Sequence, residues 1–248
     1  MTGPKYQDPR LDAALETLAA SGYLADDEEG SGERLREAQA VIASDQGVLT
    51  RVRSLSTPVR TLLAGFVVGA LGAVVLLFHA RVGLEHYPAD RLFLEGVSIT
   101  SLSLLLSAFA LGGPHRPTPK PWVTWSLLGG ALLTPLMLAF LPPVDLMLPG
   151  AKGGGGGFGR EAFVCSVYGL GASFPMVAAL ALLRRVPTTD GRLAVLGAGA
   201  AGLAGVLALQ LHCPIGLRSH LLLGHAVVPL LLIVILLLVH RTFGGFRS

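Results

Sequence analysis

Six apolar stretches, each of about 20 residues, alternate with short polar loops along most of this chain. They begin near Val59 and end near His240, and the loops between them are rich in Pro, Gly and Arg. An α-helix needs about 20 apolar residues at 1.5 Å rise to cross the roughly 30 Å hydrocarbon core of a bilayer. The pattern therefore predicts an all-α, polytopic membrane protein with six transmembrane helices.

The ends of the apolar runs place the predicted helices, because Pro, Gly and Arg gather at span boundaries. The fifth span is packed with small residues between Gly197 and Gly205. Small residues let neighbouring helices approach closely, so we expect this helix to lie at the centre of the bundle. The six predicted spans are residues 59–79, 92–111, 122–141, 162–183, 193–212 and 221–239.

The first 58 residues differ sharply in composition and predict a short, partly disordered head. Two helical segments with narrow apolar stripes are expected there. A head of about 50 residues with so few large apolar side chains cannot offset its chain entropy alone, so we expect it to fold on a partner. The expected domains are 1–58, 59–240 and 241–248, and the expected partner-contact residues are Leu11, Leu15, Leu18, Leu35, Val41 and Ile42.

Charge divides unevenly between the head and the rest of the chain. Residues 1–50 carry ten acids and four bases, a net charge of −6, which leaves +9 for the remainder. Basic residues near a membrane gather on the cytoplasmic side. With the N-terminus inside, ten of the fifteen later Lys and Arg residues fall on the inner side and five on the outer side. We therefore expect both termini in the cytoplasm.

The middles of the predicted helices offer little for transport or catalysis. Carriers need charged or unwound sites at mid-bilayer. The polar residues in the middles of these helices are uncharged, such as Ser101, Ser103 and Thr134. No nucleophile with a base and an orienting acid can be assembled on the inner face, where Asp190 is the only acid beyond the head. We therefore expect no enzyme and keep a small-molecule or metal transporter as the alternative function.

Both cysteines and several histidines fall at the outer end of the bundle in this topology. Thiolates and imidazoles are ligands that Zn²⁺ and copper prefer. His220 and His225 are five residues apart, however, which on an ideal α-helix places them on different faces. A disulfide, or simple burial of the thiols, is the alternative to a sensing or metal site. The candidate residues are Cys165, His212, Cys213, His220 and His225.

Two acids lie near the same end of the bundle. Glu95 or Glu161 could add a carboxylate to a metal site. Acids inside a membrane are candidates for a functional role. Because Glu95 is only a few residues into its span, we expect it to face interfacial water or to bond a neighbouring helix.

The order of these features resembles that of bacterial membrane anti-sigma factors, of the NrsF family and its relative CarR. The shared features are an acidic cytoplasmic head, an Arg-containing lead into six helices, and the run Cys165 … Arg184-Arg185 … His212-Cys213-Pro214 … His220 … His225. The resemblance covers about residues 50 to 240. It implies sequestration of an extracytoplasmic-function sigma factor at the bacterial inner membrane until light-generated singlet oxygen, or another oxidant or envelope signal, releases it.

The charge of the head agrees with such a partner. A sigma factor presents basic surfaces to DNA phosphates, and a head of net charge −6 with leucine stripes can cover such a surface. The expected partners are thus the sigma factor and the lipid bilayer, without direct nucleic-acid binding. We further hypothesise that chemistry at the outer cysteines and histidines alters helix packing and weakens the hold of the head on its partner.

Overall fold

The computed structural model of the protein describes residues 48–80, 84, 87–112, 118–141, 158–184, 191–215 and 218–244. The chain divides into two compact units, Met1–Gly47 and Val48–Ser248, and every described residue belongs to the second. Residues 48–58, which the sequence assigns to the head, are thus part of the second unit. The predicted contact residues Leu11, Leu15, Leu18, Leu35, Val41 and Ile42 lie outside the described residues.

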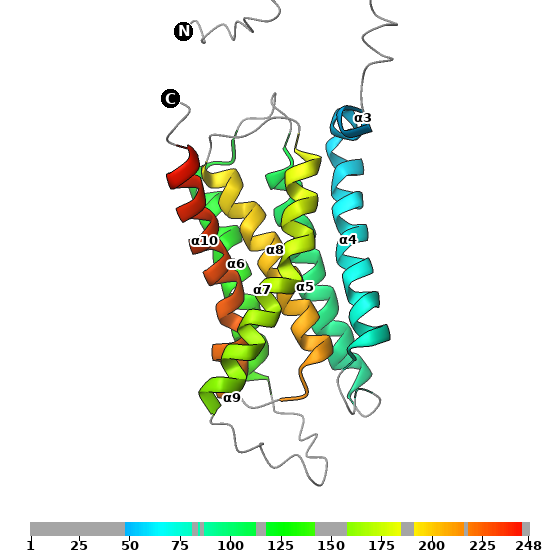
Figure 1. The fold of residues 1–248 in the computed structure, drawn as a ribbon, viewed down its shortest axis with the longest axis vertical. Coiled ribbons are helices and arrows are strands. Elements are labelled where there is room, and N and C mark those ends of the chain that lie inside the picture. The colour runs from blue at the N-terminus through cyan, green and yellow to red at the C-terminus, as the bar shows by residue number, and fades with distance from the viewer. Residues whose placement is uncertain are drawn as a thin grey trace, which may run out of the picture. The chain divides into compact units, whose positions relative to one another are not determined.

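The described residues are helical and contain no strand (Figure 1). Six helices among them are long and apolar enough to cross a membrane, so the predicted six-span fold is confirmed, with span ends within four residues of those expected. A short α3 (Val48–Ser54) precedes them. The first five are α4 (Thr57–Phe78), α5 (Ala89–Ala110), α6 (Pro121–Phe140), α7 (Phe158–Leu183) and α8 (Gly191–His212).

The sixth span, Arg218–Val239, is not one continuous α-helix. It begins with α9 (Arg218–His220), passes through the π-helix η2 (Leu221–Ala226) and continues into α10 (Val227–Gly244). A π-helix closes its hydrogen bonds between residues five apart and usually occurs as a single turn within an α-helix. The sequence predicts one helix over residues 221–239 with Pro229 inside it, and the π-helix at its start is a finding of the structure.

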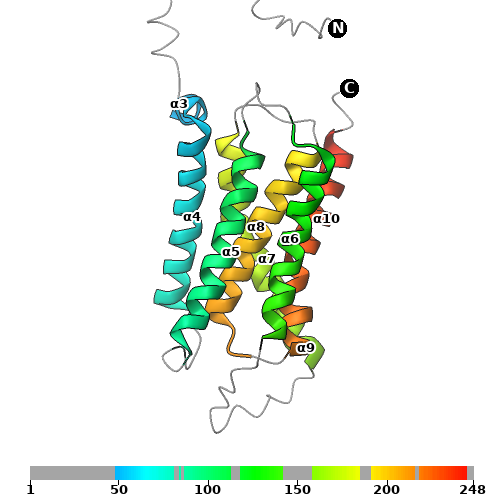
Figure 2. The same ribbon diagram turned by 180° about the vertical axis from the view of Figure 1, so that it is seen from behind.

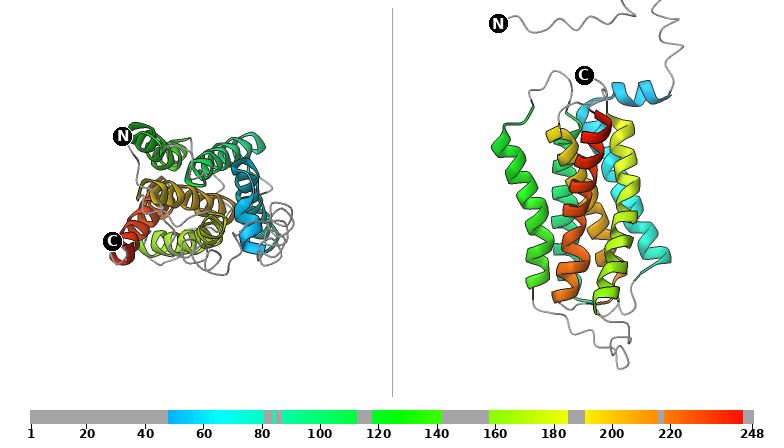
Figure 3. Two further views of the ribbon diagram at one scale, coloured as in Figure 1. Left: turned by 90° about the horizontal axis from the view of Figure 1, so that it is seen from above. Right: turned by 60° about the vertical axis from the view of Figure 1, so that its left-hand side comes forward.

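The small-residue helix α8 lies at the centre of the bundle, as predicted (Figure 3). It contacts all five of the other long helices of the described structure. The approach is closest at two glycines, where a Cβ on Gly202 would come within 2.6 Å of Pro229 Cα in α10. A Cβ on Gly205 would collide with the Ser173 hydroxyl and the Gly169 carbonyl of α7. Only glycine allows these two crossings, because their partners include backbone atoms that cannot move aside.

The bundle has two ends, which Figures 1 and 2 show from opposite sides. α3 and the last turns of α7 and α10 lie at one end, which we call the α3 end. α9 and the first turns of α7 lie at the other, which we call the α9 end. The described acidic residues Asp90, Glu95 and Glu161 belong to the starts of α5 and α7 and so lie at the α9 end. By the charge rule applied above, the α3 end is the expected cytoplasmic end.

Candidate functional site: a cysteine and histidine cluster

Two cysteines and two histidines meet at the α9 end. Cys165 comes from the first turns of α7, Cys213 directly follows α8, and His220 and His225 come from α9 and η2. One ligand atom from each lies within 4.8 Å of the others. The two Sγ atoms are 3.6 Å apart, and Cys213 Sγ is 3.3 Å from His220 Nε2. We call these four residues the Cys–His cluster.

The π-helix is what allows both histidines to join this cluster. On an α-helix, positions five apart differ by about 140° around the axis, which would separate the two rings. In η2 the turn closes over five residues instead. The rings of His220 and His225 consequently meet edge to face, with centroids 5.6 Å apart. The expectation that this spacing keeps the histidines on different faces is therefore wrong, because it assumed α-helical geometry.

Pro229 supplies a physical reason for the π-helix. In a regular α-helix the Pro229 ring would clash with the carbonyl of His225, four residues earlier, and would leave it without a donor. The wider turn relieves that clash. Ser166 of α7 further supports the altered backbone, because its Oγ lies 3.0 Å from the Leu223 carbonyl oxygen and 3.3 Å from that of Gly224. Pro229 was the sequence signal that could have indicated the interruption.

Gly224 provides the space in which the cluster forms. A Cβ at this position would lie 3.3 Å from Cys165 Cβ and 3.4 Å from His220 Nε2. The first of these distances is tighter than most real side-chain contacts, so a larger residue would press Cys165 and His220 apart. The glycine thus lets α7 approach η2 closely enough for the thiol and imidazole groups to meet.

Three of the four cluster residues are buried, and the cluster holds polar atoms without hydrogen-bond partners among the described residues. His220, His225 and Cys213 are 0%, 1% and 4% exposed. Nδ1 of His220 and both ring nitrogens of His225 have no hydrogen-bond partner among the described residues. Buried polar atoms are normally paired, and leaving one unpaired costs about 1–3 kcal/mol. These nitrogens are therefore suited to a ligand that completes their coordination.

Two kinds of chemistry fit this set of donors. Two sulfur and two nitrogen atoms are the preferred ligands of Zn²⁺ or Cu⁺, which suits the metals expected from the sequence. Alternatively, the thiols of Cys165 and Cys213, which are not joined by a disulfide here, can lose two protons and two electrons to an oxidant and form one. Both reactions would draw α7 and the end of α8 together.

Among the five candidate Cys and His residues, His212 is the one that the structure does not bring into the cluster. Its Nδ1 donates a hydrogen bond to the His79 carbonyl oxygen at 2.8 Å. Its ring stacks on Tyr168, with centroids 4.3 Å apart. The side chain therefore ties the end of α8 to α4 and α7, although its neighbour Cys213 joins the cluster.

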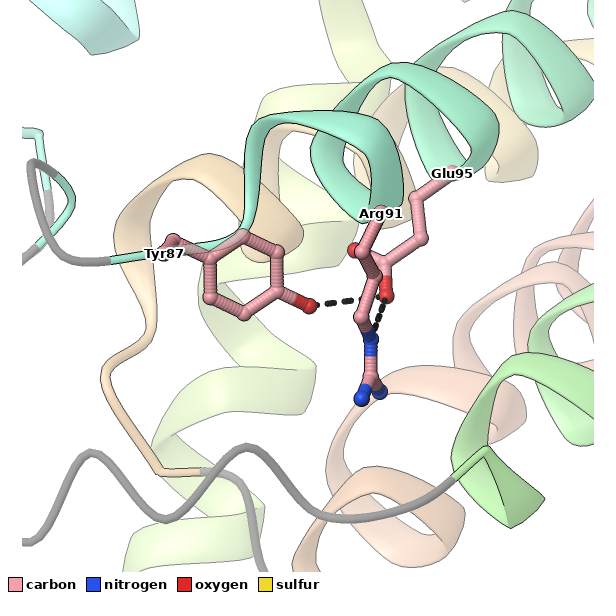
Figure 4. A network of polar contacts seen from close by, with 3 residues as sticks. All are labelled: Tyr87, Arg91 and Glu95. Atoms are coloured by element: carbon pink, nitrogen blue, oxygen red, sulfur yellow. Dashed lines mark hydrogen bonds and ion pairs between the residues drawn. The ribbon is translucent and has the colours of Figure 1, made fainter.

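Glu95 is also outside the four clustered residues, as is Glu161. Its Oε1 accepts hydrogen bonds from the Tyr87 hydroxyl at 2.8 Å and from Arg91 Nε at 2.9 Å (Figure 4). The side chain is only 2% exposed, and Oε2 has no partner among the described residues. The expectation that Glu95 faces water or a neighbouring helix is therefore wrong, since it bonds its own helix and the residue that leads into it.

Two arginines, one from α3 and one from α4, hold the opposite end of α7. Arg60 is buried, and its Nη1 donates to the Leu183 carbonyl oxygen at 2.9 Å. Arg53, in α3, donates from Nε to the Leu182 carbonyl oxygen at 3.0 Å. The last carbonyls of a helix lack intrahelical partners and carry partial negative charge, so guanidinium groups stabilise them. α7 therefore carries Cys165 near its start and is held at its end by α3 and α4.

Comparison with known proteins gives the chain a family. It matches the family described as NrsF, negative regulator of sigma F, over residues 44–243. Comparisons with curated proteins and with solved structures gave no match. The matched segment includes all six spans, the Cys–His cluster and both arginine anchors of α7, while the leucine stripe that begins at Leu11 lies outside it. The chain therefore belongs to the NrsF family, whose members are described as negative regulators of a sigma factor.

Proposed function

We propose that this multi-pass membrane protein sequesters an extracytoplasmic-function sigma factor at the bacterial inner membrane. The head, residues 1–58, binds the sigma factor, and a change at the Cys–His cluster releases it. Family membership supports a sigma factor as the partner. The observation that carries the release step is the placement of Cys165 and the arginine anchors at opposite ends of α7.

Charge and apolar stripes support the head as the binding segment. Its net charge of −6 over residues 1–50 complements the basic, DNA-binding surfaces of a sigma factor. A stripe such as Leu11, Leu15 and Leu18 matches the spacing with which an amphipathic helix fills an apolar groove. A short segment that orders on binding is also readily switched, because its affinity depends on how it is presented.

The cluster can act on the head because α7 is a continuous helix between them. Disulfide formation would shorten the distance between the two Sγ atoms from 3.6 Å to about 2.05 Å, and metal binding would likewise re-aim both thiols. Cys165 moves together with α7, since packed helices shift as units. Movement of the Leu182 and Leu183 carbonyls then disturbs their hydrogen bonds to Arg53 and Arg60. Arg53 is among the last residues of the head, and Arg60 follows the head directly.

A reporter for the sigma factor tests the cluster. Cys165→Ser and Cys213→Ser should each lock the protein on or off, so that oxidants and soft metals such as Cd²⁺ and Cu⁺ no longer change reporter output. Ser101→Ala, at an exposed position of α5, is the control and should respond like wild type. Wild-type induction of both cysteine variants by every oxidant and metal tested would exclude the cluster from signalling.

Co-purification from membranes tests the head. In the full-length protein, Leu11→Asp with Leu15→Asp places charge in the apolar stripe and should abolish capture of the sigma factor. Ala13→Asp with Thr17→Asp adds the same charge on the opposite side of an ideal helix and should spare capture. Capture by wild type should also weaken as salt rises, because surface charge pairs are screened. Equal capture by both double variants would refute the stripe as the contact.

Protease protection tests the proposed orientation. Epitope tags placed before Met1 and after Ser248 should survive protease in intact spheroplasts and be digested only after lysis. Digestion of either tag in intact spheroplasts would place that terminus outside and would contradict release of a cytoplasmic partner.

A further inference from the structure

A groove of about 230 Å³ opens between α7, α8 and α10 at the α3 end. α7 packs against η2 at the α9 end, and the two helices α7 and α10 diverge toward the α3 end (Figure 1). Apolar residues from all three helices line the groove, including Ala181, Gly197 and Val239. Arg184 is the charged residue of the lining. The groove is thus apolar apart from one cation, Arg184, which directly follows the end of α7.

The Arg184 guanidinium retains a donor that is buried and unused. Its Nη2 donates to the Leu193 carbonyl oxygen at 2.7 Å and lies against Gly197, where an added Cβ would be 3.0 Å away. Its Nε is buried and has no hydrogen-bond partner among the described residues. Burial also lowers the pKa of Arg184 below its usual value, because the charged form loses hydration. An anion at Nε would satisfy the donor and offset that loss.

The described part of the protein provides no carboxylate for this position. Its acids, Asp90, Glu95 and Glu161, all belong to the α9 end. Arg241, by contrast, follows the lining residue Val239 by two positions in α10, so the surroundings are basic. The anion must therefore come from outside the described chain, and it must tolerate apolar walls beside it.

We propose that this groove binds an anionic phospholipid. The phosphate accepts a hydrogen bond from Arg184 Nε, and an acyl chain lies along the apolar walls between α7 and α10. Arginine is well suited to phosphate because its guanidinium is planar and always charged. Basic pockets between transmembrane helices on the cytoplasmic side are typical binding sites for anionic headgroups. The proposal is independent of how the head or the Cys–His cluster functions.

Thermal unfolding of the purified full-length protein in neutral detergent tests this site. Phosphatidylglycerol should raise the Tm of the wild type by on the order of 3 °C more than phosphatidylcholine with the same acyl chains. Native mass spectrometry should show the same preference as retained phosphatidylglycerol. Arg184→Gln should abolish the preference, and Arg184→Lys, which keeps the charge, should restore part of it.

Two matched variants separate the headgroup from the acyl chain. Arg51→Gln removes one positive charge from an exposed position of α3, outside the groove lining, and should keep the preference for phosphatidylglycerol. Ala181→Leu fills the groove without changing charge and should reduce retention of both lipids. Four results would overturn the proposal: no lipid preference in wild type, an unchanged preference in Arg184→Gln, equal stabilisation by inorganic phosphate, or a dimer in which a second copy displaces lipid.

Discussion

His220 and His225 are five positions apart in the chain, yet their rings meet edge to face with centroids 5.6 Å apart. The π-helix between them brings both imidazoles to the side of η2 that faces Cys165 and Cys213. A regular α-helix would have placed only one of the two imidazoles on that side. The donor set of this family member therefore depends on a single irregular turn, and the turn is a target for experiment.

Pro229→Ala should weaken the cluster. Removing the ring restores an N–H donor for the His225 carbonyl and permits an α-helical turn, which rotates the two histidines apart. Cd²⁺ affinity, followed by the ultraviolet absorbance of thiolate–metal bonds, should fall about 10- to 100-fold, as is usual when ligand-orienting residues are lost. Pro175→Ala, at an exposed position of α7, is the control. Unchanged affinity in Pro229→Ala would show that the turn does not depend on this proline.

Gly224→Ala should separate the two thiols. The new methyl group would sit 3.3 Å from Cys165 Cβ and 3.4 Å from His220 Nε2, so α7 must retreat from η2. We expect disulfide formation under a mild oxidant to slow about tenfold, comparable to the smaller losses seen for supporting residues of metal sites. Free-thiol counting over time measures this rate. Gly171→Ala, also in α7 but with open space around its Cβ, should react like wild type.

Arg60→Gln should loosen the end of α7 and uncouple the cluster from the head. The loss of a buried, charge-assisted hydrogen bond to the Leu183 carbonyl should lower the free energy of unfolding by about 2–3 kcal/mol. The sigma reporter should then respond weakly to oxidants and metals that still react with Cys165. Arg51→Gln removes the same charge from an exposed position of α3 and should have neither effect. A full reporter response in Arg60→Gln would contradict transmission through this contact.

Gly205→Ala should destabilise the bundle from its centre. Its Cβ would collide with the Ser173 hydroxyl and with the Gly169 backbone carbonyl, which cannot move without shifting α7. Overpacking of this kind costs about 1–3 kcal/mol, which unfolding by a denaturing detergent can measure. Gly129→Ala in α6 meets nothing within 4 Å and should leave stability unchanged or slightly higher. Equal stability of the two variants would contradict a close contact between α7 and α8 at Gly205.

Much of the fold could be predicted because a helix that crosses the hydrocarbon core of a bilayer must be apolar. Each span must be apolar for about 20 residues, so the six helices could be predicted from the pattern of apolar residues alone. The central place of α8 also followed from its glycines and alanines, since only small side chains allow five neighbours to pack around one helix. That the acidic head is a solvated segment, and which of its residues contact a partner, both stay predictions.

Only part of the site could be predicted from the sequence, because the sequence gives the depth of a side chain in the membrane but not its direction. Sequence alone placed Cys165, Cys213, His220 and His225 at one depth, because span ends determine depth. It also placed His212 and Glu95 there, and it could not tell which side chains turn toward one another. His212 instead stacks on Tyr168, and Glu95 bonds Tyr87 and Arg91. Direction around a helix axis depends on packing, which apolar sequence specifies weakly.

The sequence by itself determined the class of protein, the number of spans, the division of charge and the kinds of ligand atom available, since these follow from composition and from the thickness of a bilayer. Only the tertiary structure decided that an irregular turn before Pro229 unites two histidines with two thiols, and that Arg53 and Arg60 hold the far end of α7. Such contacts join residues far apart in the chain, and their geometry exists only once the helices have packed.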